Sequence, residues 1–201
     1  MNPFDLSNKV ICVTGASSGI GRQCAVSCSR MGATVVLLAR NEQRLHETLS
    51  IMDNPDKHVI IPVDLTEYAT VELVVKNIVS QVGRISGVLH CAGISTTLPL
   101  KLVTPEKLDE FFQANVFSAY NLTREVCKMG NFSKEGGSIV FFSSVMGKVG
   151  ENGKSLYGMT KGALVSGTRS LACELAKKKI RVNTVSPGVV ITPINYNLPY
   201  C

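Results

Sequence analysis

Apolar and polar positions follow two distinct patterns along this chain. Short continuous apolar runs predict buried β-strands at 10–13, 35–39, 58–63, 87–91, 138–142 and 180–185. The longer segments between them carry apolar residues at helical spacing and predict α-helices at 22–31, 41–52, 66–82, 104–129 and 155–178. Two of these helices have explicit start signals, which are Asn41 as a cap in one and Thr104 followed by Pro105 in the other.

Strands that are apolar throughout and alternate with helices are typical of a parallel sheet with helices on both faces. We therefore predict a Rossmann-type, doubly wound α/β fold with strand order 3-2-1-4-5-6 and right-handed crossovers. Pro62 indicates that the third strand lies at a sheet edge or ends there. Because no linker, repeat or low-complexity segment interrupts the pattern, residues 1–201 are predicted to form a single domain.

Charge and hydropathy restrict the possible partners. The 21 basic and 15 acidic residues give a formal charge of +6, which suits an anionic ligand such as a dinucleotide phosphate. The one dense basic run, 177–179, lies at an expected helix end, where solvated cations complement the dipole, so no nucleic-acid partner is indicated. The start of the sequence lacks a signal-peptide pattern and no apolar run could span a bilayer. We expect a soluble, cytoplasmic protein.

The seven cysteines are odd in number and include no C-x-x-C pair, so they do not suggest a disulfide framework. Six are interpreted as small buried hydrophobic residues in a reducing compartment: Cys12, Cys24, Cys28, Cys91, Cys127 and Cys173. Cys24 and Cys28 share a helix face, but no histidine or carboxylate accompanies them. We expect no metal site.

A glycine-rich turn joins the first strand to the first helix, with the sequence Thr14-Gly15-Ala16-Ser17-Ser18-Gly19-Ile20-Gly21. Glycine is needed where the backbone turns sharply or approaches a pyrophosphate, and a helix N-terminus attracts anions. In this fold, ligands bind beyond the strand ends where strands one and four diverge, next to Gly15 and Ala92-Gly93. A strand-to-helix turn that binds nothing is the alternative interpretation.

A second group of polar residues is expected at the same end of the sheet. Tyr157 and Lys161 are four residues apart on the long helix and share a face, and Ser144 follows the fifth strand. A nearby ammonium favours tyrosinate, so we expect Lys161 to lower the pKa of Tyr157 toward the working pH of a general acid. Ser144 can donate a hydrogen bond to an oxygen on which charge develops. An exposed pair without a role is the alternative for Tyr157 and Lys161.

Together, the glycine-rich turn, Asn115, Ser144 and the segment Tyr157-Gly158-Met159-Thr160-Lys161 resemble the signature of the short-chain dehydrogenase/reductase family. The resemblance covers essentially the whole chain. It implies that Tyr157 is the catalytic acid/base and that Ser144 polarises the carbonyl. It further implies that Lys161 also binds the nicotinamide ribose and that Asn115 helps to hold a water relay.

The same resemblance implies a nicotinamide dinucleotide site. Its expected residues are Gly15, Ser17, Ser18, Gly19, Ile20, Gly21, Arg40, Asp64, Leu65, Ala92, Gly93, Tyr157, Lys161, Pro187, Gly188, Val190 and Thr192. Asp64 would contact adenine, although a strand-end helix cap is an alternative role for it. Arg40 stands just after the strand-two position where an acid would bind an NAD ribose, and its planar fork suits a 2′-phosphate. A surface arginine is the alternative, and the usual second basic residue is replaced by Ser17-Ser18. We infer NADP(H).

Two departures from the family pattern stand out. The family's Asn-Asn-Ala-Gly after strand four is replaced by His90-Cys91-Ala92-Gly93, and we expect His90 to be structural. Family members usually continue through a substrate-covering segment to a final strand, whereas this sequence stops at Cys201. We expect a flexible lid beyond Cys201 in the full-length protein, which an intact mass above 21.6 kDa would indicate. Residues after Pro193 should form no regular element and should lie at the mouth of the cleft.

The implied activity is hydride transfer between NADP(H) and a carbonyl or secondary alcohol, with 3-oxoacyl-thioester reduction as one candidate. The substrate is then a small molecule, free or linked to an acyl-carrier protein. A non-catalytic NADP(H)-binding sensor or scaffold is the alternative. Relatives pair through the two long helices, here 104–129 and 155–178, so a homodimer or homotetramer is expected. Small residues along 162–172 would allow close packing there.

Overall fold

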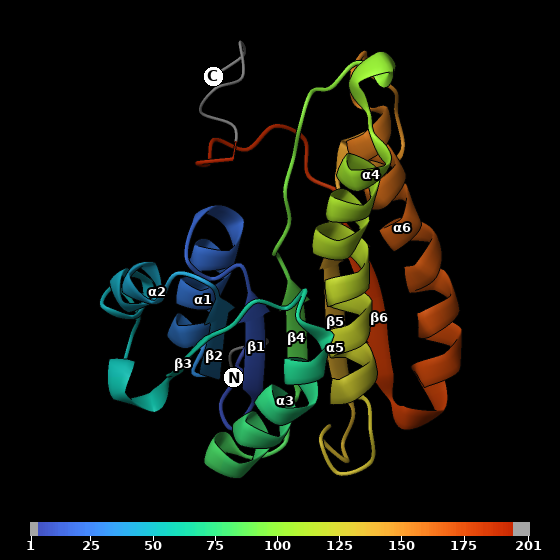
Figure 1. The fold of residues 1–201 in the computed structure, drawn as a ribbon. Helices are drawn as coiled ribbons and strands as arrows, with labels where there is room; N and C mark the ends of the chain where they lie inside the picture. Colours follow the sequence, from blue (N-terminus) through green and yellow to red (C-terminus); the bar gives the residue numbers. More distant parts are fainter. Residues whose placement is uncertain (1–3, 195–201) are drawn as a thin grey trace.

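Six parallel strands form the centre of the molecule in the order β3-β2-β1-β4-β5-β6, as the sequence predicts (Figure 1). The structure is a computed structural model that describes residues 4–194. The strands are β1 (Val10–Thr14), β2 (Thr34–Ala39), β3 (Val59–Pro62), β4 (Gly87–His90), β5 (Gly137–Phe142) and β6 (Ile180–Val185). The third strand lies at one edge of the sheet and ends at Pro62, which confirms both positions expected for this proline.

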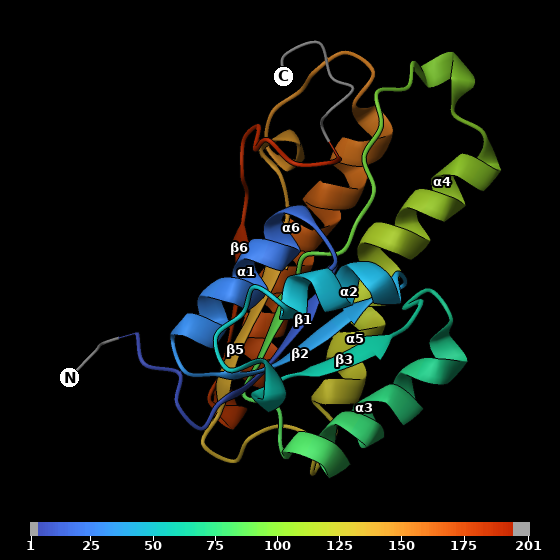
Figure 2. The same cartoon turned by 90° about the vertical axis from the view of Figure 1, so that its left-hand side faces the viewer.

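Helices cover both faces of the sheet. They are α1 (Gly19–Arg30), α2 (Glu42–Leu49), α3 (Tyr68–Val82), α4 (Pro105–Phe112), α5 (Ser118–Val126) and α6 (Ser155–Leu175). One core cluster joins the sheet to α1 and α2, and the other joins it to α3, α5 and α6. Figure 2 shows the two layers with the sheet between them.

The two cores explain why the strands are apolar without interruption. Successive side chains of a strand point to opposite faces. In β1, Cys12 packs into the cluster under α3 and α5, while Ile11 and Val13 pack into the cluster under α1 and α2. Because both faces are buried, no position of β1 can be polar without a partner, and the strand reads as a continuous apolar run.

The strand order reverses between β1 and β4, and this reversal positions the site. Val13 of β1 is in register with Leu37 of β2 on one side and with Leu89 of β4 on the other. The segments that follow β1 and β4 leave the sheet in different directions beyond this point, so they open a cleft at the carboxyl ends of the strands.

The sequence predicts one helix over 104–129, but the structure divides it. The helix begins as expected, with Thr104 as cap and Pro105 at its first position. It is then interrupted by a π-helical turn, η3 (Gln113–Phe117), before it continues as α5 and ends at Val126. The other expected boundaries differ by a few residues: α2 ends at Leu49, and α6 gives way to the 3₁₀ turn η5 (Ala176–Lys178).

The expectation that six cysteines are buried is wrong in part. Cys12 is fully buried, whereas Cys173 is exposed and the other four are partly buried. The reason is position, because Cys173 lies on the outer side of α6 near its end, and the partly buried thiols border the cleft or the helix surfaces. All six thiols are free. Within residues 4–194, no helix is long and apolar enough to cross a membrane.

Candidate active site

The glycine-rich turn is folded so tightly that it admits no side chains at two positions. Gly15 has φ +65°, and a Cβ there would lie 2.9 Å from the backbone nitrogen of Ala92. A Cβ on Gly21 would overlap the carbonyl oxygen of Gly15. The turn therefore brings bare backbone to the cleft and lets α1 pack directly against it.

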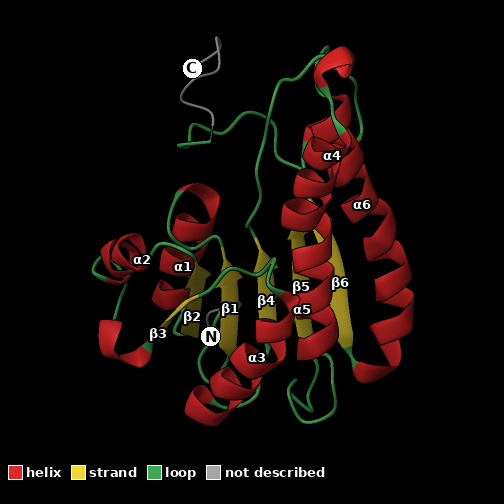
Figure 3. Ribbon diagram, viewed as in Figure 1, coloured by secondary structure: helices red, strands yellow, loops and turns green. Residues whose placement is uncertain are grey.

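The N-terminus of α1 is left open toward the cleft. Its cap residue Ser18 is extended and its side chain makes no capping hydrogen bond, and the first turn carries no acidic residue. The loop after β6 passes above this end of the helix, where the Thr192 side chain would lie 3.1 Å from a Cβ on Gly19 (Figure 3). The unpaired N–H groups and the positive end of the helix dipole make this a fitting place for a phosphate group.

The turn borders a cleft of about 860 Å³ that runs along the carboxyl ends of the strands. Every residue that the sequence assigns to the dinucleotide lines it: Gly15, Ser17, Ser18, Gly19, Ile20, Gly21, Arg40, Asp64, Leu65, Ala92, Gly93, Tyr157, Lys161, Pro187, Gly188, Val190 and Thr192. Ser144 lines it too, while Asn115 lies behind its wall. Across residues 4–194, no group of three His, Cys, Asp or Glu is arranged to hold a metal ion.

Tyr157 and Lys161 share one face of α6, as their spacing predicts. The Lys161 ammonium lies 5.7 Å from the centroid of the Tyr157 ring and donates a hydrogen bond of 2.8 Å to the Phe142 carbonyl at the end of β5. Ser144 follows that strand and its hydroxyl contacts the Tyr157 hydroxyl. The Ser144 oxygen also accepts the Met146 N–H at 3.2 Å, which fixes its orientation.

The electrostatics of this pair differ from the sequence-based expectation. Burial raises the pKa of Tyr157 above its usual value, and the hydrogen bond with Ser144 offsets this only in part. Burial also lowers the pKa of Lys161, to about 8. The pKa of Tyr157 is therefore not brought toward neutral pH, because the loss of solvation destabilises the tyrosinate.

Asn115 lies in the π-helical turn, which explains the break in the predicted helix. Its Oδ1 accepts the Ile94 N–H at 2.7 Å, and its Nδ2 donates to the Ile94 carbonyl and to the Thr160 hydroxyl, both at 3.0 Å. The π-helical turn places the Asn115 amide between the segment after β4 and α6, so that it bonds to both. Gly93 permits this approach, since a Cβ there would lie 2.9 Å from Asn115 Oδ1. A π turn inside a helix is frequent at functional positions.

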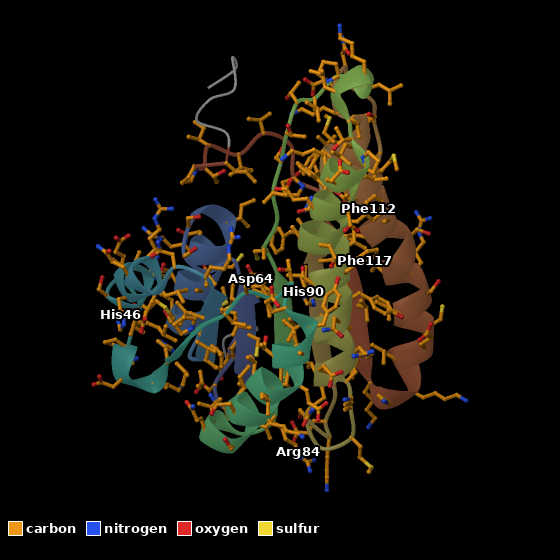
Figure 4. All side chains as sticks on the ribbon, viewed as in Figure 1. His46, Asp64, Arg84, His90, Phe112 and Phe117 are labelled. Carbon is orange, nitrogen blue, oxygen red and sulfur yellow. The ribbon has the colours of Figure 1, made fainter. Side chains whose placement is uncertain are left out.

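The far end of the cleft carries opposite charges. Asp64 Oδ1 accepts the N–H and the hydroxyl of Thr66 at 3.0 and 2.7 Å, so this carboxylate holds the turn after β3. It does not cap a helix, because the N-cap of α3 is Glu67. Burial raises its pKa, but these hydrogen bonds and the Arg40 guanidinium hold the pKa below its usual value. Arg40 Nη1 lies 3.8 Å from Asp64 Oδ2 on a side chain that is 76% exposed. Figure 4 labels Asp64 at this end of the sheet.

Two cationic residues of the cleft were missed by the sequence reasoning. Lys154 is only 8% exposed and donates a hydrogen bond of 3.2 Å to the Thr96 carbonyl. Lys154 stands three residues before Tyr157, and this spacing is the sequence signal that could have identified it. Arg44 lines the cleft from the first turn of α2, and its N–H donates a hydrogen bond of 2.9 Å to Oδ1 of the cap residue Asn41. The position of Arg44 four residues after Arg40 is the signal that the sequence offered for it.

This arrangement defines a class of protein: a Rossmann-type nucleotide-binding domain with a serine, a tyrosine and a lysine at the point where the strand order reverses. Sequence comparison narrows the class. The family model of the short chain dehydrogenases matches residues 9–199, and the chain belongs to this family. Its members are oxidoreductases that use nicotinamide cofactors.

Individual relatives are also similar to nearly the whole length of this chain. The chain is 34% identical to the NADPH-dependent aldehyde reductase 1 of Arabidopsis thaliana chloroplasts over 94% of its length and 68% of that protein. It is 32% identical to the 3-oxoacyl-[acyl-carrier-protein] reductase FabG of Thermotoga maritima, over 96% of this chain and 79% of the relative. A short-chain alcohol dehydrogenase structure from Sinorhizobium meliloti matches with a TM-score of 0.90 at 28% identity, covering 98% of this chain and 78% of the other.

Proposed function

We propose that this protein is an NADPH-dependent reductase of carbonyl compounds. One observation carries the proposal: Ser144, Tyr157 and Lys161 line the same cleft as the glycine-rich turn and the open end of α1. A phosphate cradle and a proton donor are thus side by side in one cavity. The dinucleotide fits the turn because the positions of Gly15 and Gly21 leave no room for a side chain.

Different residues would bind different parts of the dinucleotide. The open end of α1 would hold the pyrophosphate, Asp64 and Leu65 the adenine, and Lys161 the nicotinamide ribose. The segment of Pro187, Gly188, Val190 and Thr192 would hold the carboxamide end. When bound, NADPH supplies the hydride.

The proton comes from the protein. The Tyr157 hydroxyl donates it to the carbonyl oxygen while Ser144 donates a hydrogen bond to the same oxygen. The raised pKa of Tyr157 keeps its hydroxyl protonated at neutral pH, as reduction requires. Alcohol oxidation is the same proton transfer in reverse, with tyrosinate as the base. The Lys161 ammonium stabilises the tyrosinate that donation leaves behind.

NADPH is preferred over NADH in this proposal because the ribose end of the cleft is cationic. Arg40 follows the end of β2, and Arg44, in the first turn of α2, lines the same end of the cleft. A guanidinium donates two parallel hydrogen bonds to a phosphate. A relative at 34% identity is named as NADPH-dependent, which agrees with this assignment. The substrate is a ketone, aldehyde or 3-oxoacyl thioester, free or carried by an acyl-carrier protein.

We further propose that two copies pair through the α4–α5 segment and α6. Apolar side chains on this side are exposed, among them Leu108, Phe117, Tyr120 and Met159. Figure 4 shows Phe117 together with Phe112 on the segment next to α6, and their ring centroids are 5.9 Å apart. Gly167 of α6 has open space around it, which lets a partner helix approach closely.

The test is NADPH oxidation with a panel of ketones, aldehydes and acyl thioesters. Wild-type protein should consume NADPH with at least one class. Tyr157→Phe should abolish turnover but retain NADPH affinity, because only the proton donor is lost. Tyr68→Phe is the matched control, since Tyr68 is exposed on α3 and should leave the rate unchanged. Near wild-type turnover by Tyr157→Phe, or no NADPH binding by the wild type, would refute the proposal.

A further inference from the structure

Two cysteine thiols meet beneath the glycine-rich turn. Cys24 lies in α1 just after the turn, and Cys91 follows β4 directly. Their thiols are hydrogen-bonded to each other. Both side chains, together with Cys28 one turn further along α1, pack against the core cluster of β1, β2 and α1. Residues that are 67 positions apart in sequence thus form one sulfur cluster.

One member of the pair borders the cleft. Cys91 lines the cavity, and Cys24 does not line it but is partly exposed, so a small uncharged oxidant has a route to the pair. The next residue, Ala92, touches the turn itself, since a Cβ on Gly15 would lie 2.9 Å from its nitrogen. A bond between the two sulfur atoms would therefore tie α1 to the segment after β4 at the base of the cleft.

The two thiols have different roles in their hydrogen bond. The Cys91 thiol donates to Cys24, and this lowers the pKa of Cys24. The same bond, reinforced by burial, raises the pKa of Cys91. Cys28 is a weaker candidate, because burial raises the pKa of its thiol to about 11. Since the thiolate is the nucleophile in thiol chemistry, Cys24 is the residue of the cluster that reacts first.

We propose that Cys24 and Cys91 form a modification site that a peroxide converts to an intramolecular disulfide. The Cys24 thiolate attacks one oxygen of hydrogen peroxide, the O–O bond breaks, and after protonation one water leaves, with Cys24 now a sulfenic acid. The Cys91 sulfur then attacks the Cys24 sulfur, the S–O bond breaks, and the Cys91 proton leaves with the hydroxide as a second water. Two thiols are oxidised and one peroxide is reduced to two waters.

The experiment uses the whole chain carrying Cys173→Ser, which removes the exposed thiol that would form intermolecular bonds. The protein is treated with stoichiometric hydrogen peroxide, the remaining thiols are alkylated, and trypsin is added without reductant. Trypsin cuts after Arg22, Arg30, Arg84 and Lys101, so a Cys24–Cys91 disulfide joins peptide 23–30 to peptide 85–101. We expect this joined peptide, and we expect dithiothreitol to separate it.

Variants assign the bond to its partners. Peptide 23–30 contains both Cys24 and Cys28, so Cys28→Ser is the matched control and should keep the cross-link. Cys24→Ser should lose it. Cys91→Ser should instead accumulate oxygen on Cys24, because no second thiol resolves the sulfenic acid. The joined peptide shows that Cys91 is bonded to Cys24 or Cys28, and its persistence in Cys28→Ser assigns the bond to Cys24. A Cys24–Cys28 bond, a cross-link that survives Cys24→Ser, or peroxide treatment that leaves both thiols reduced would overturn the proposal.

Discussion

Protonation of His90 should make the stability of this protein strongly dependent on pH. His90 ends β4, is 3% exposed and stacks on Phe141 with ring centroids 4.6 Å apart (Figure 4). The Thr123 hydroxyl donates to the Ala119 carbonyl, so it accepts the His90 Nε2–H at 2.9 Å. This fixes the neutral tautomer and leaves Nδ1 without a partner among the described residues. A proton added at Nδ1 would be a buried charge without compensation.

The magnitude follows from the difference in pKa between the two states. Burial lowers the pKa of His90 from 6.5 to about 3 in the folded protein. The unfolded chain therefore takes up a proton below pH 6.5 that the folded chain refuses, and the free energy of unfolding falls as the pH drops from 6.5 toward 3. At 1.4 kcal/mol per unit, the loss between pH 7.5 and pH 5 is about 2 kcal/mol.

Urea unfolding at pH 7.5 and pH 5, followed by circular dichroism at one protein concentration, measures this loss. His90→Asn removes the titrating group, so its free energy of unfolding should fall by about 2 kcal/mol less than that of the wild type over this range. Other groups, including His58 with its own lowered pKa, contribute equally to both proteins and cancel. Exposed His46→Asn is the control and should match the wild type. Equal pH dependence in wild type and His90→Asn would refute the reasoning.

Three further predictions concern the proposed function. The rate of carbonyl reduction should decline as the pH rises through about 8, because Lys161 then loses the charge that stabilises the tyrosinate. A pH–rate profile that stays flat to pH 9.5 would contradict this. Arg40→Ala should weaken NADPH binding by about 1.5–3 kcal/mol and barely change NADH binding. If titrations show that NADPH and NADH lose the same binding free energy, Arg40 does not contact the 2′-phosphate. Light scattering at micromolar concentration should give at least a dimer, whereas a stable monomer would speak against pairing through α6.

Much of the fold could be predicted because its signals are local. The strands are buried on both faces, so each reads as an apolar run, and β6 has the predicted bounds Ile180–Val185. The helix starts at Asn41 and Thr104 depend on caps within four residues, and both side chains accept the expected backbone N–H. Strand order follows from the alternation of strands and helices together with the handedness of crossovers.

The features that the sequence did not predict depend on distant contacts. The π-helical turn is held by Asn115 through hydrogen bonds to Ile94 and Thr160, which lie on other elements. Within residues 104–129 the helical pattern of apolar positions continues without a break, so no local signal predicts the π-helical turn. The exposure of Cys173 has a similar origin, since only the packing of α6 against the sheet decides which side of that helix faces solvent.

The same distinction explains why the residues of the site could be predicted while their pKa values could not. The spacing of Tyr157 and Lys161 guarantees that they share a helix face, and it suggests that the ammonium lowers the pKa of the hydroxyl. Whether it does so depends on how much water remains around the pair, because desolvation destabilises both charged forms. Lys161 is only 6% exposed, and α6, the end of β5 and the loop after β4 together exclude solvent from it. The fold thus holds Tyr157 protonated before any ligand binds, and groups that enter the cleft set the final pKa values.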